Sequence, residues 1–345
     1  MLKTSHIKLV LTGLSLVFIF GCGPTFNSPS SAPAPSSNDT SSLVPEPSHT
    51  EKGICSSLDF LGFSWPSNMF EFEKEALEIA LNITGSFEGP YGWRNLTNDF
   101  DGQGLSMGLM NQTLGTGSLQ PLLLKMRNQH QTTFEKLFQA DHLQSLLVML
   151  SQFEKSMGAH SFSQPLSPLD TDSDASAAGD VATLSSVEWA RKTIYDSPGT
   201  FNPIWKQELL NLAGSPEYVA LQIDAAWALH LQALRLHQLM AVYELRTYLL
   251  MFDIVVQNGN LKPQDEADYR TYVSQNPKAS AQQRLQKIVD LRLRWVKPKY
   301  QNDVRLRKMS LINGMGVVHG VSRQYEKEFC FNRRQAFPRQ PTPLP

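Results

Sequence analysis

The sequence predicts an α+β fold that is mainly helical, with a small β-hairpin or sheet directly after the first helix. Apolar residues recur at helical spacing over most of the region 53–332. Residues 84–117 interrupt this pattern, because they contain eight Gly but few periodic apolar residues. Such a composition is typical of turns and short strands. No internal repeat is visible, so we expect one domain.

Four helices can be bounded from the sequence. The first begins after an N-cap at Asn68 and stops at Gly85, which is a frequent helix-ending residue. Residues 216–256 are apolar almost all round, as in a buried central helix, and their length suggests that it is kinked or split. Two basic helices follow near 280–297 and 300–313.

The first 21 residues have the pattern of a signal peptide. A basic start precedes an apolar run over 9–20, which is shorter than the ~20 residues of a membrane span. Residues 19–22, IFGC, resemble a bacterial lipobox, so we expect lipidation of Cys22. An ordinary signal peptide with a chance Cys is the alternative. Gly23 favours the outer membrane, and we expect attachment at its periplasmic face or at the cell surface.

A Ser/Pro-rich segment separates this anchor from the folded domain. Ser and Pro make up 14 of the 28 residues from 23 to 50, which cannot bury enough apolar area to fold. We therefore expect a disordered tether over 22–52 and a domain over 53–332, with a flexible surface loop at 161–182. Residues 333–345 are expected to form a tail.

The chain contains only 3 Cys, which excludes a disulfide-rich scaffold. With Cys22 lipidated, Cys55 and Cys330 remain near the two ends of the domain in an oxidising compartment. We predict that they form a disulfide; two buried free thiols are the alternative.

Charge and residue spacing exclude several function classes. The net charge of −1 lacks the global basic signature of a nucleic-acid-binding protein. Asp residues alternate over 170–174, but Ala175 and Val181 stand where an EF-hand loop needs Gly and Glu. His230 and His237 lack the spacing of a compact metal site, so we interpret them as core or surface residues. We expect no metal and no cofactor.

Residues 104–108 match the Gly-x-Ser-x-Gly nucleophile elbow of serine hydrolases. That elbow requires a buried strand before the Ser and a helix after it, within an alternating α/β chain. Here a turn precedes the motif and the alternation is missing, which argues against Ser106 as a nucleophile.

A carboxylate pair offers different chemistry. Glu88 lies at the end of the first helix, and Asp101 opens the Gly-rich turn 13 residues later. Glycosidic cleavage needs one carboxylic acid for the leaving oxygen and one carboxylate for water or sugar. Phe87 and Trp93 offer apolar surroundings for Glu88, and Ser106 can hold a water. Two acids that merely cap turns are the alternative.

The turn also resembles a known family. Residues 101–108, DGQGLSMG, and the later GTG of 115–117 are similar to the motif of the lysozyme-fold chitosanases, glycoside hydrolase family 46. The resemblance implies Glu88 as general acid, Asp101 as general base and Ser106 as the residue that positions water.

Two further motifs extend this resemblance. Residues 252–259, FDIVVQNG, and 290–292, DLR, are similar to the family's second and third motifs, and Arg307 takes the place of a later Arg. The resemblance implies that Asp253, Arg292 and Arg307 form a charge network behind the catalytic Glu. Arginine forks can lock a carboxylate in one orientation.

The motif departs from the chitosanases at Gln103, Leu105 and Asn258. Residues 307–308 and 313–320 resemble instead a bacterial branch of lysozyme-like proteins. This combination implies that the substrate need not be chitosan itself.

We therefore expect a monomeric, lipid-anchored glycosidase of lysozyme-like fold that cleaves β-1,4 bonds in peptidoglycan, including deacetylated peptidoglycan, or in another glucosamine-containing glycan such as chitosan. Tyr91 and Trp93 are candidates for sugar stacking, and Asp99 is a candidate substrate contact and the alternative base. Water activation implies inversion of configuration. Lytic transglycosylation by Glu88 alone is one alternative, and a non-catalytic cell-wall glycan-binding lipoprotein is the other.

Overall fold

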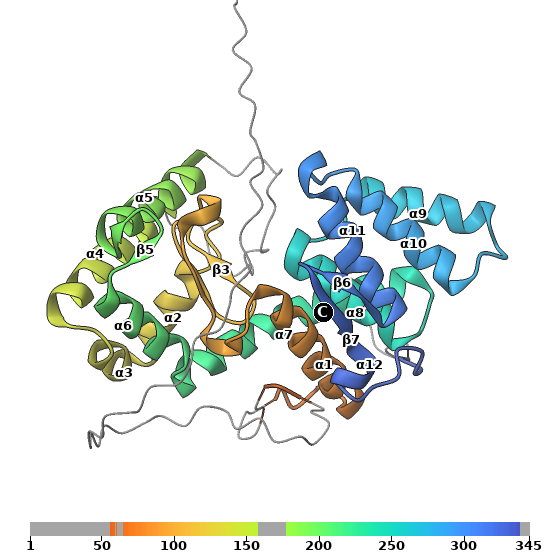
Figure 1. The fold of residues 1–345 in the computed structure, drawn as a ribbon, viewed down its shortest axis with the longest axis horizontal. Coiled ribbons are helices and arrows are strands. Elements are labelled where there is room, and N and C mark those ends of the chain that lie inside the picture. Colours follow the sequence, from red (N-terminus) through yellow and green to blue (C-terminus); the bar gives the residue numbers. More distant parts are fainter. Residues whose placement is uncertain (1–55, 59, 61–64, 158–176, 339–345) are drawn as a thin grey trace, which may run out of the picture. The chain divides into compact units, whose positions relative to one another are not determined.

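The computed structural model describes residues 56–58, 60, 65–157 and 177–338. This part of the chain is α+β and mainly helical, which confirms the predicted class (Figure 1). The signal peptide, Cys22, the tether and Cys55 lie outside the described residues. In the described ranges, no helix combines the length and the apolar character that crossing a bilayer requires.

The first helix, α1 (Glu71–Glu88), begins later than predicted. Its N-cap is Phe70 and not Asn68. The cap lacks a side-chain acceptor, but the Glu73 carboxylate accepts a hydrogen bond from the Phe70 backbone N–H at 3.1 Å. Glu73 therefore makes the same hydrogen bond to the N-cap backbone N–H that the acidic residue of a capping box makes.

The same helix also ends later than predicted, because Gly85 lies inside it. A Cβ at Gly85 would stand 2.2 Å from Cδ1 of the buried Leu109, so this glycine provides close packing and does not end the helix. The helix ends before Gly89, where a Cβ would lie 2.6 Å from Oδ1 of Asn95. Glu88 is consequently the last helical residue, which fixes the direction of its side chain.

A small sheet follows α1, as predicted. It is antiparallel with the order β1-β2-β3, and its register places Ser106 between Thr97 and Thr113. Two 3₁₀ turns accompany the sheet and carry the candidate residues of the Gly-rich region. The elements are η1 (Gly92–Arg94), β1 (Leu96–Thr97), η2 (Asp99–Asp101), β2 (Ser106–Met107) and β3 (Gln112–Thr113).

Helices and a hairpin then enclose a hydrophobic cluster around Phe134, Leu150 and Trp205. Their bounds are α2 (Gln120–Gln129), α3 (Gln131–Lys136), α4 (Ala140–Met157), α5 (Ala177–Thr193), β4 (Tyr195–Ser197), β5 (Thr200–Phe201) and α6 (Pro203–Ala213). The loop predicted to reach residue 182 is already helical from Ala177, because residues 177–182 include three Ala, the strongest helix former.

The apolar segment 216–256 is split, as predicted, into α7 (Pro216–Met240) and α8 (Leu245–Asn258). The break occurs at Ala241, whose φ is +49°. Residues of α7 belong to the cluster around Trp205 at its start and to a second, larger cluster from Ala226 onward. This helix therefore connects the two hydrophobic cores.

The larger cluster is completed by α1, α8 and the C-terminal elements. The basic segments are helical as predicted, and α10 contacts both α9 and α11 (Figure 1). The C-terminal elements are α9 (Pro263–Gln275), α10 (Ala281–Leu293), α11 (Pro298–Asn313), β6 (Met315–Val318), β7 (Val321–Gln324) and α12 (Tyr325–Glu328).

The tail predicted from residue 333 begins later than expected. The backbone N–H of Phe337 donates to the Tyr243 carbonyl at 3.0 Å, and the buried Phe337 ring stacks on Tyr248 at 4.8 Å. Burial of this ring, together with backbone hydrogen bonds from Leu245 to Gln335 and from Arg246 to Arg333, holds the segment in place. Nearby, Cys330 is disulfide-bonded, and its expected partner Cys55 lies outside the described residues.

Both histidines of α7 are buried, and Nδ1 of His230 lies 2.7 Å from the Tyr248 hydroxyl. Burial lowers the pKa of His230 to about 3 and that of His237 to about 4, against 6.5 for an exposed histidine. Between pH 6.5 and these lowered pKa values, the two histidines bind protons in the unfolded chain but not in the folded chain. The free energy of unfolding therefore falls as pH decreases from 6.5 toward 4.

Urea unfolding at pH 7, 6 and 5 measures this loss. We expect His237→Gln, which removes one of the two groups, to make the decrease between pH 7 and pH 5 smaller. An unchanged pH dependence in this variant would contradict the assignment of the effect to buried neutral histidine.

Candidate active site

Glu88 extends from the end of α1 toward α11. Its Oε1 accepts a hydrogen bond from Nη1 of Arg307 at 2.8 Å, and its side chain retains 18% exposure. The Arg307 guanidinium also lies over the Phe87 ring, 4.3 Å from the ring centroid. The glutamate is therefore held on one side by a buried cation while part of it still reaches solvent.

Asp253 of α8 holds Arg307 from behind. Its Oδ1 accepts hydrogen bonds from Nε of Arg307 at 3.0 Å and from Nη2 at 2.7 Å. Its Oδ2 accepts from Nζ of Lys308, which also donates to Oε1 of Gln257 at 2.7 Å. Asp253, Arg307 and Lys308 are all buried. We call these four side chains, Glu88, Arg307, Asp253 and Lys308, the buried network.

The charges of the buried network stabilise each other. Burial alone would raise the pKa of Asp253, but the charges of Arg307 and Lys308 and their hydrogen bonds outweigh it and hold this pKa below its usual value. Burial lowers the pKa of Lys308 to about 8 although Asp253 opposes the change. Asp253 and the two cations, Arg307 and Lys308, thus face each other in a region that water does not reach.

Of the residues predicted to support Glu88, Arg307 contacts it directly and Asp253 contacts Arg307, whereas Lys308 was not predicted. Helical spacing could have indicated its burial, because Lys308 and Arg307 share one helix face with Val304 and Leu311. Both of these apolar residues belong to the core. The expected third member, Arg292, is buried on α10, and its charge contributes to lowering the pKa of Lys308.

Asp101 and Ser106 occupy different environments. Asp101 is exposed at the end of η2, where its Oδ1 accepts a hydrogen bond from the Gln103 N–H at 3.2 Å. Ser106 is completely buried in β2. Within the described ranges, no hydrogen bond joins either residue to Glu88 or to Arg307. The predicted role of Ser106 was to position a water, and in the described residues its Oγ has no hydrogen-bond partner.

The other predicted contacts also differ from one another. Tyr91 is 73% exposed, whereas Trp93 packs against the larger hydrophobic cluster with its ring 6.0 Å from that of Phe60. Asp99 is engaged by Arg191, which donates to its Oδ2 at 2.5 Å. Burial would raise the pKa of Asp99, but the bonds from Arg191 and from the Gly104 N–H lower it. Of these three residues, Tyr91 has the most accessible side chain.

The residues of the Gly-x-Ser-x-Gly match have a structural role and do not form a nucleophile elbow. Its serine lies buried in a strand of an antiparallel sheet, so it is not presented on a strand-to-helix turn as a nucleophile elbow requires. Gly104 has φ +78°, and a Cβ there would stand 2.9 Å from the backbone Cα of Val187 in α5. This glycine is therefore needed for backbone conformation and for the approach of α5.

Gly104→Ala is expected to lower the free energy of unfolding by about 1–3 kcal/mol, because it adds backbone strain and a contact with backbone atoms that cannot move aside. Chemical denaturation monitored by circular dichroism measures the loss. Gly320→Ala is the matched control: Gly320 has φ +78° but no atom within 4 Å of the added Cβ. Equal losses in both variants would show that packing against α5 contributes nothing.

In the described part of the chain, no group of three or more His, Cys, Asp or Glu residues is arranged to hold a metal ion. Comparisons of the chain with protein-family models, with curated proteins and with solved structures found no match. The geometry of the buried network therefore carries the functional argument.

Proposed function

We propose that this chain is a glycosidase that cleaves β-1,4 bonds in peptidoglycan or in a related glucosamine-containing glycan, with Glu88 as the general acid. The proposal rests on one observation. Three buried charged side chains, Arg307, Asp253 and Lys308, are arranged behind a single oxygen of a partly exposed glutamate. Such an arrangement costs desolvation free energy, which is typical of a carboxyl group whose orientation matters for chemistry.

The proposal assigns the remaining roles to the second oxygen of Glu88 and to Asp101. Arg307 holds Oε1 of Glu88, so Oε2 is the oxygen available to donate a proton to the leaving glycosidic oxygen. Asp101 is exposed on the turn after β1 and is the proposed base that removes a proton from the attacking water. Direct attack by water gives a product of inverted configuration.

Digestion of defined glycans tests the proposal. The wild-type protein is incubated with native peptidoglycan, with chemically deacetylated peptidoglycan and with chitosan, and the soluble products are analysed by mass spectrometry. Hydrolysis adds one water to each new pair of ends, whereas lytic transglycosylation yields products lighter by one water. Release of hydrolytic products from at least one glycan supports the proposal.

The alternative is a non-catalytic glycan-binding protein of the same fold. It is favoured by the departures from the chitosanase motifs at Gln103, Leu105 and Asn258. Binding to all three glycans without release of new sugar ends would favour this alternative over catalysis.

A further inference from the structure

The turn η2 displays a large aromatic side chain that the proposed reaction has not used. Phe100 stands between Asp99 and Asp101 and is 78% exposed. An exposed aromatic residue by itself is common at protein surfaces. Phe100 differs because its turn is held firmly at both sides and because its neighbour in sequence is the proposed catalytic base.

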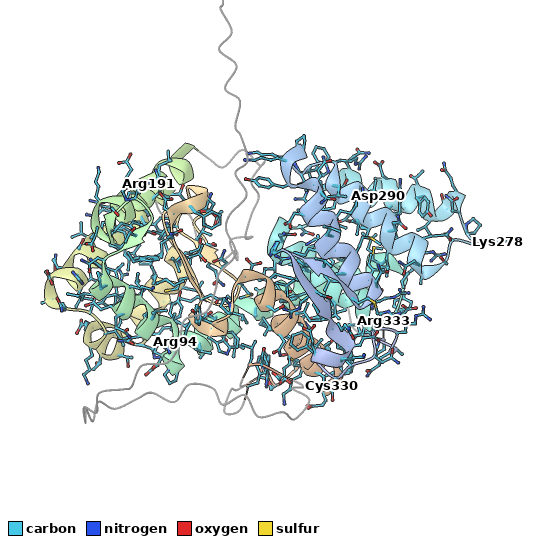
Figure 2. All side chains as sticks on the ribbon, viewed as in Figure 1. Arg94, Arg191, Lys278, Asp290, Cys330 and Arg333 are labelled. Atoms are coloured by element: carbon cyan, nitrogen blue, oxygen red, sulfur yellow. The ribbon has the colours of Figure 1, made fainter. Side chains whose placement is uncertain are left out.

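Contacts from α5 and from the β4–β5 hairpin hold the turn. Arg191 donates from Nε to Oδ2 of Asp99 at 2.5 Å and from Nη2 to the Gly102 carbonyl at 3.3 Å. The Tyr195 hydroxyl donates to the Gly104 carbonyl at 2.6 Å. Arg191 is labelled on its helix in Figure 2. These bonds fix the backbone on the C-terminal side of Phe100.

The N-terminal side of the turn is fixed in the same way. Nδ2 of Asn98 donates to the Gly199 carbonyl at 2.6 Å, and Oδ1 of Asn98 accepts from the Phe100 N–H at 3.3 Å. Inside the turn, Oδ1 of Asp99 accepts from the Gly104 N–H at 2.6 Å. The side chains of Asn98 and Asp99 are thus engaged with the protein, while those of Phe100 and Asp101 are turned outward.

A fixed, outward-facing aromatic ring is suited to the apolar C–H face of a pyranose, because ring ordering costs little entropy on binding and the contact buries apolar surface. We propose that Phe100 forms a sugar-binding subsite next to Asp101, which takes one glucosamine-type ring of the glycan. This inference rests on the proposed function. It replaces Trp93, which packs against the core, as the main stacking residue of this region.

Binding measured in a non-hydrolysing background tests the subsite. Glu88→Gln protein is titrated by calorimetry with hexasaccharides of glucosamine and of N-acetylglucosamine, alone and combined with Phe100→Ala or Phe100→Trp. We expect Phe100→Ala to weaken the Kd of the bound hexasaccharide about tenfold, which is the loss of one aromatic contact. Phe100→Trp keeps a flat ring and is expected to retain binding within about threefold.

Tyr300→Ala is the matched control, because Tyr300 is another exposed aromatic residue, 52% exposed at the start of α11. Its Kd should stay unchanged. If Phe100→Ala binds as tightly as its parent, or if Tyr300→Ala loses as much affinity, the subsite is wrong while the proposed function stands. If the Glu88→Gln parent binds neither hexasaccharide, the subsite for a glucosamine-type ring is overturned, and digestion of peptidoglycan alone then decides the proposed function.

Discussion

Asp253→Asn is expected to lower the free energy of unfolding by about 3–5 kcal/mol, the largest stability loss of any single change at the site. The substitution keeps the shape of the side chain but removes its charge. It leaves the buried Arg307 with the Glu88 carboxylate as its remaining ion-pair partner, and it removes the anion that the buried Lys308 contacts. Urea unfolding at pH 7, followed by circular dichroism, measures the change.

Asp290→Asn is the control for this prediction. Asp290 forms an ion pair with Arg305 at 2.6 Å, but both side chains are more than 40% exposed, and exposed pairs contribute about 0–1 kcal/mol. Asp290 lies on α10 and is labelled in Figure 2. If both variants lose the same small amount, the buried network does not stabilise the fold.

A double variant separates charge from packing. Lys308→Met removes one of the two cations that Asp253 neutralises, so Asp253→Asn should cost less in a Lys308→Met background than in the wild type. Purely additive losses would show that Asp253 and Lys308 are not coupled.

Glu88→Gln is expected to reduce glycan cleavage by about 10²–10⁴-fold, which is the usual contribution of a general acid, with little change in stability. The amide cannot supply the proton, yet its oxygen can still accept the hydrogen bond from Arg307. The rate of release of reducing ends from the most active of the three glycans measures the effect. Full activity in this variant would remove Glu88 from the mechanism.

Two further variants complete this test. Glu75→Gln changes an exposed carboxylate on the same helix and should retain wild-type activity. Asp101→Asn should reduce hydrolysis by a factor similar to that of Glu88→Gln if Asp101 is the base. Retained activity with products lighter by one water would assign the reaction to Glu88 alone, as in lytic transglycosylation.

The elements that were predicted correctly are those that depend on sequence patterns over a few neighbouring residues. The break between α7 and α8, the sheet after α1 and the two basic helices follow from periodicity and from turn-forming residues, because these effects act over a few neighbouring residues. The bounds of α1 were wrong at both ends. Gly85 is required by the side chain of Leu109, which is distant in sequence, and no local rule contains that contact.

Some residues of the candidate site were likewise predicted from the sequence and others were not. The family resemblance brought Glu88, Asp253 and Arg307 together, whereas periodicity alone would have assigned the arginine to a helix face. Lys308 was missed because a lysine is expected in solvent unless a buried anion balances it. Trp93 was expected to stack on a sugar, but packing against Phe60 buries it partly. Ser106 was expected to hold a water, and pairing between two strands buries it wholly.

The sequence by itself determined which segments become helices or short strands and where the chain must turn, because backbone preference and apolar spacing are local properties. It also supplied the charged residues of the site. Only the tertiary structure decided which of these charges meet. Glu88 and Arg307 are 219 positions apart, and their contact exists because α1 and α11 both pack against α8. Because these elements bury Asp253, Arg307 and Lys308, the carboxylate and the two cations depend on one another: charges removed from water need partners of opposite sign.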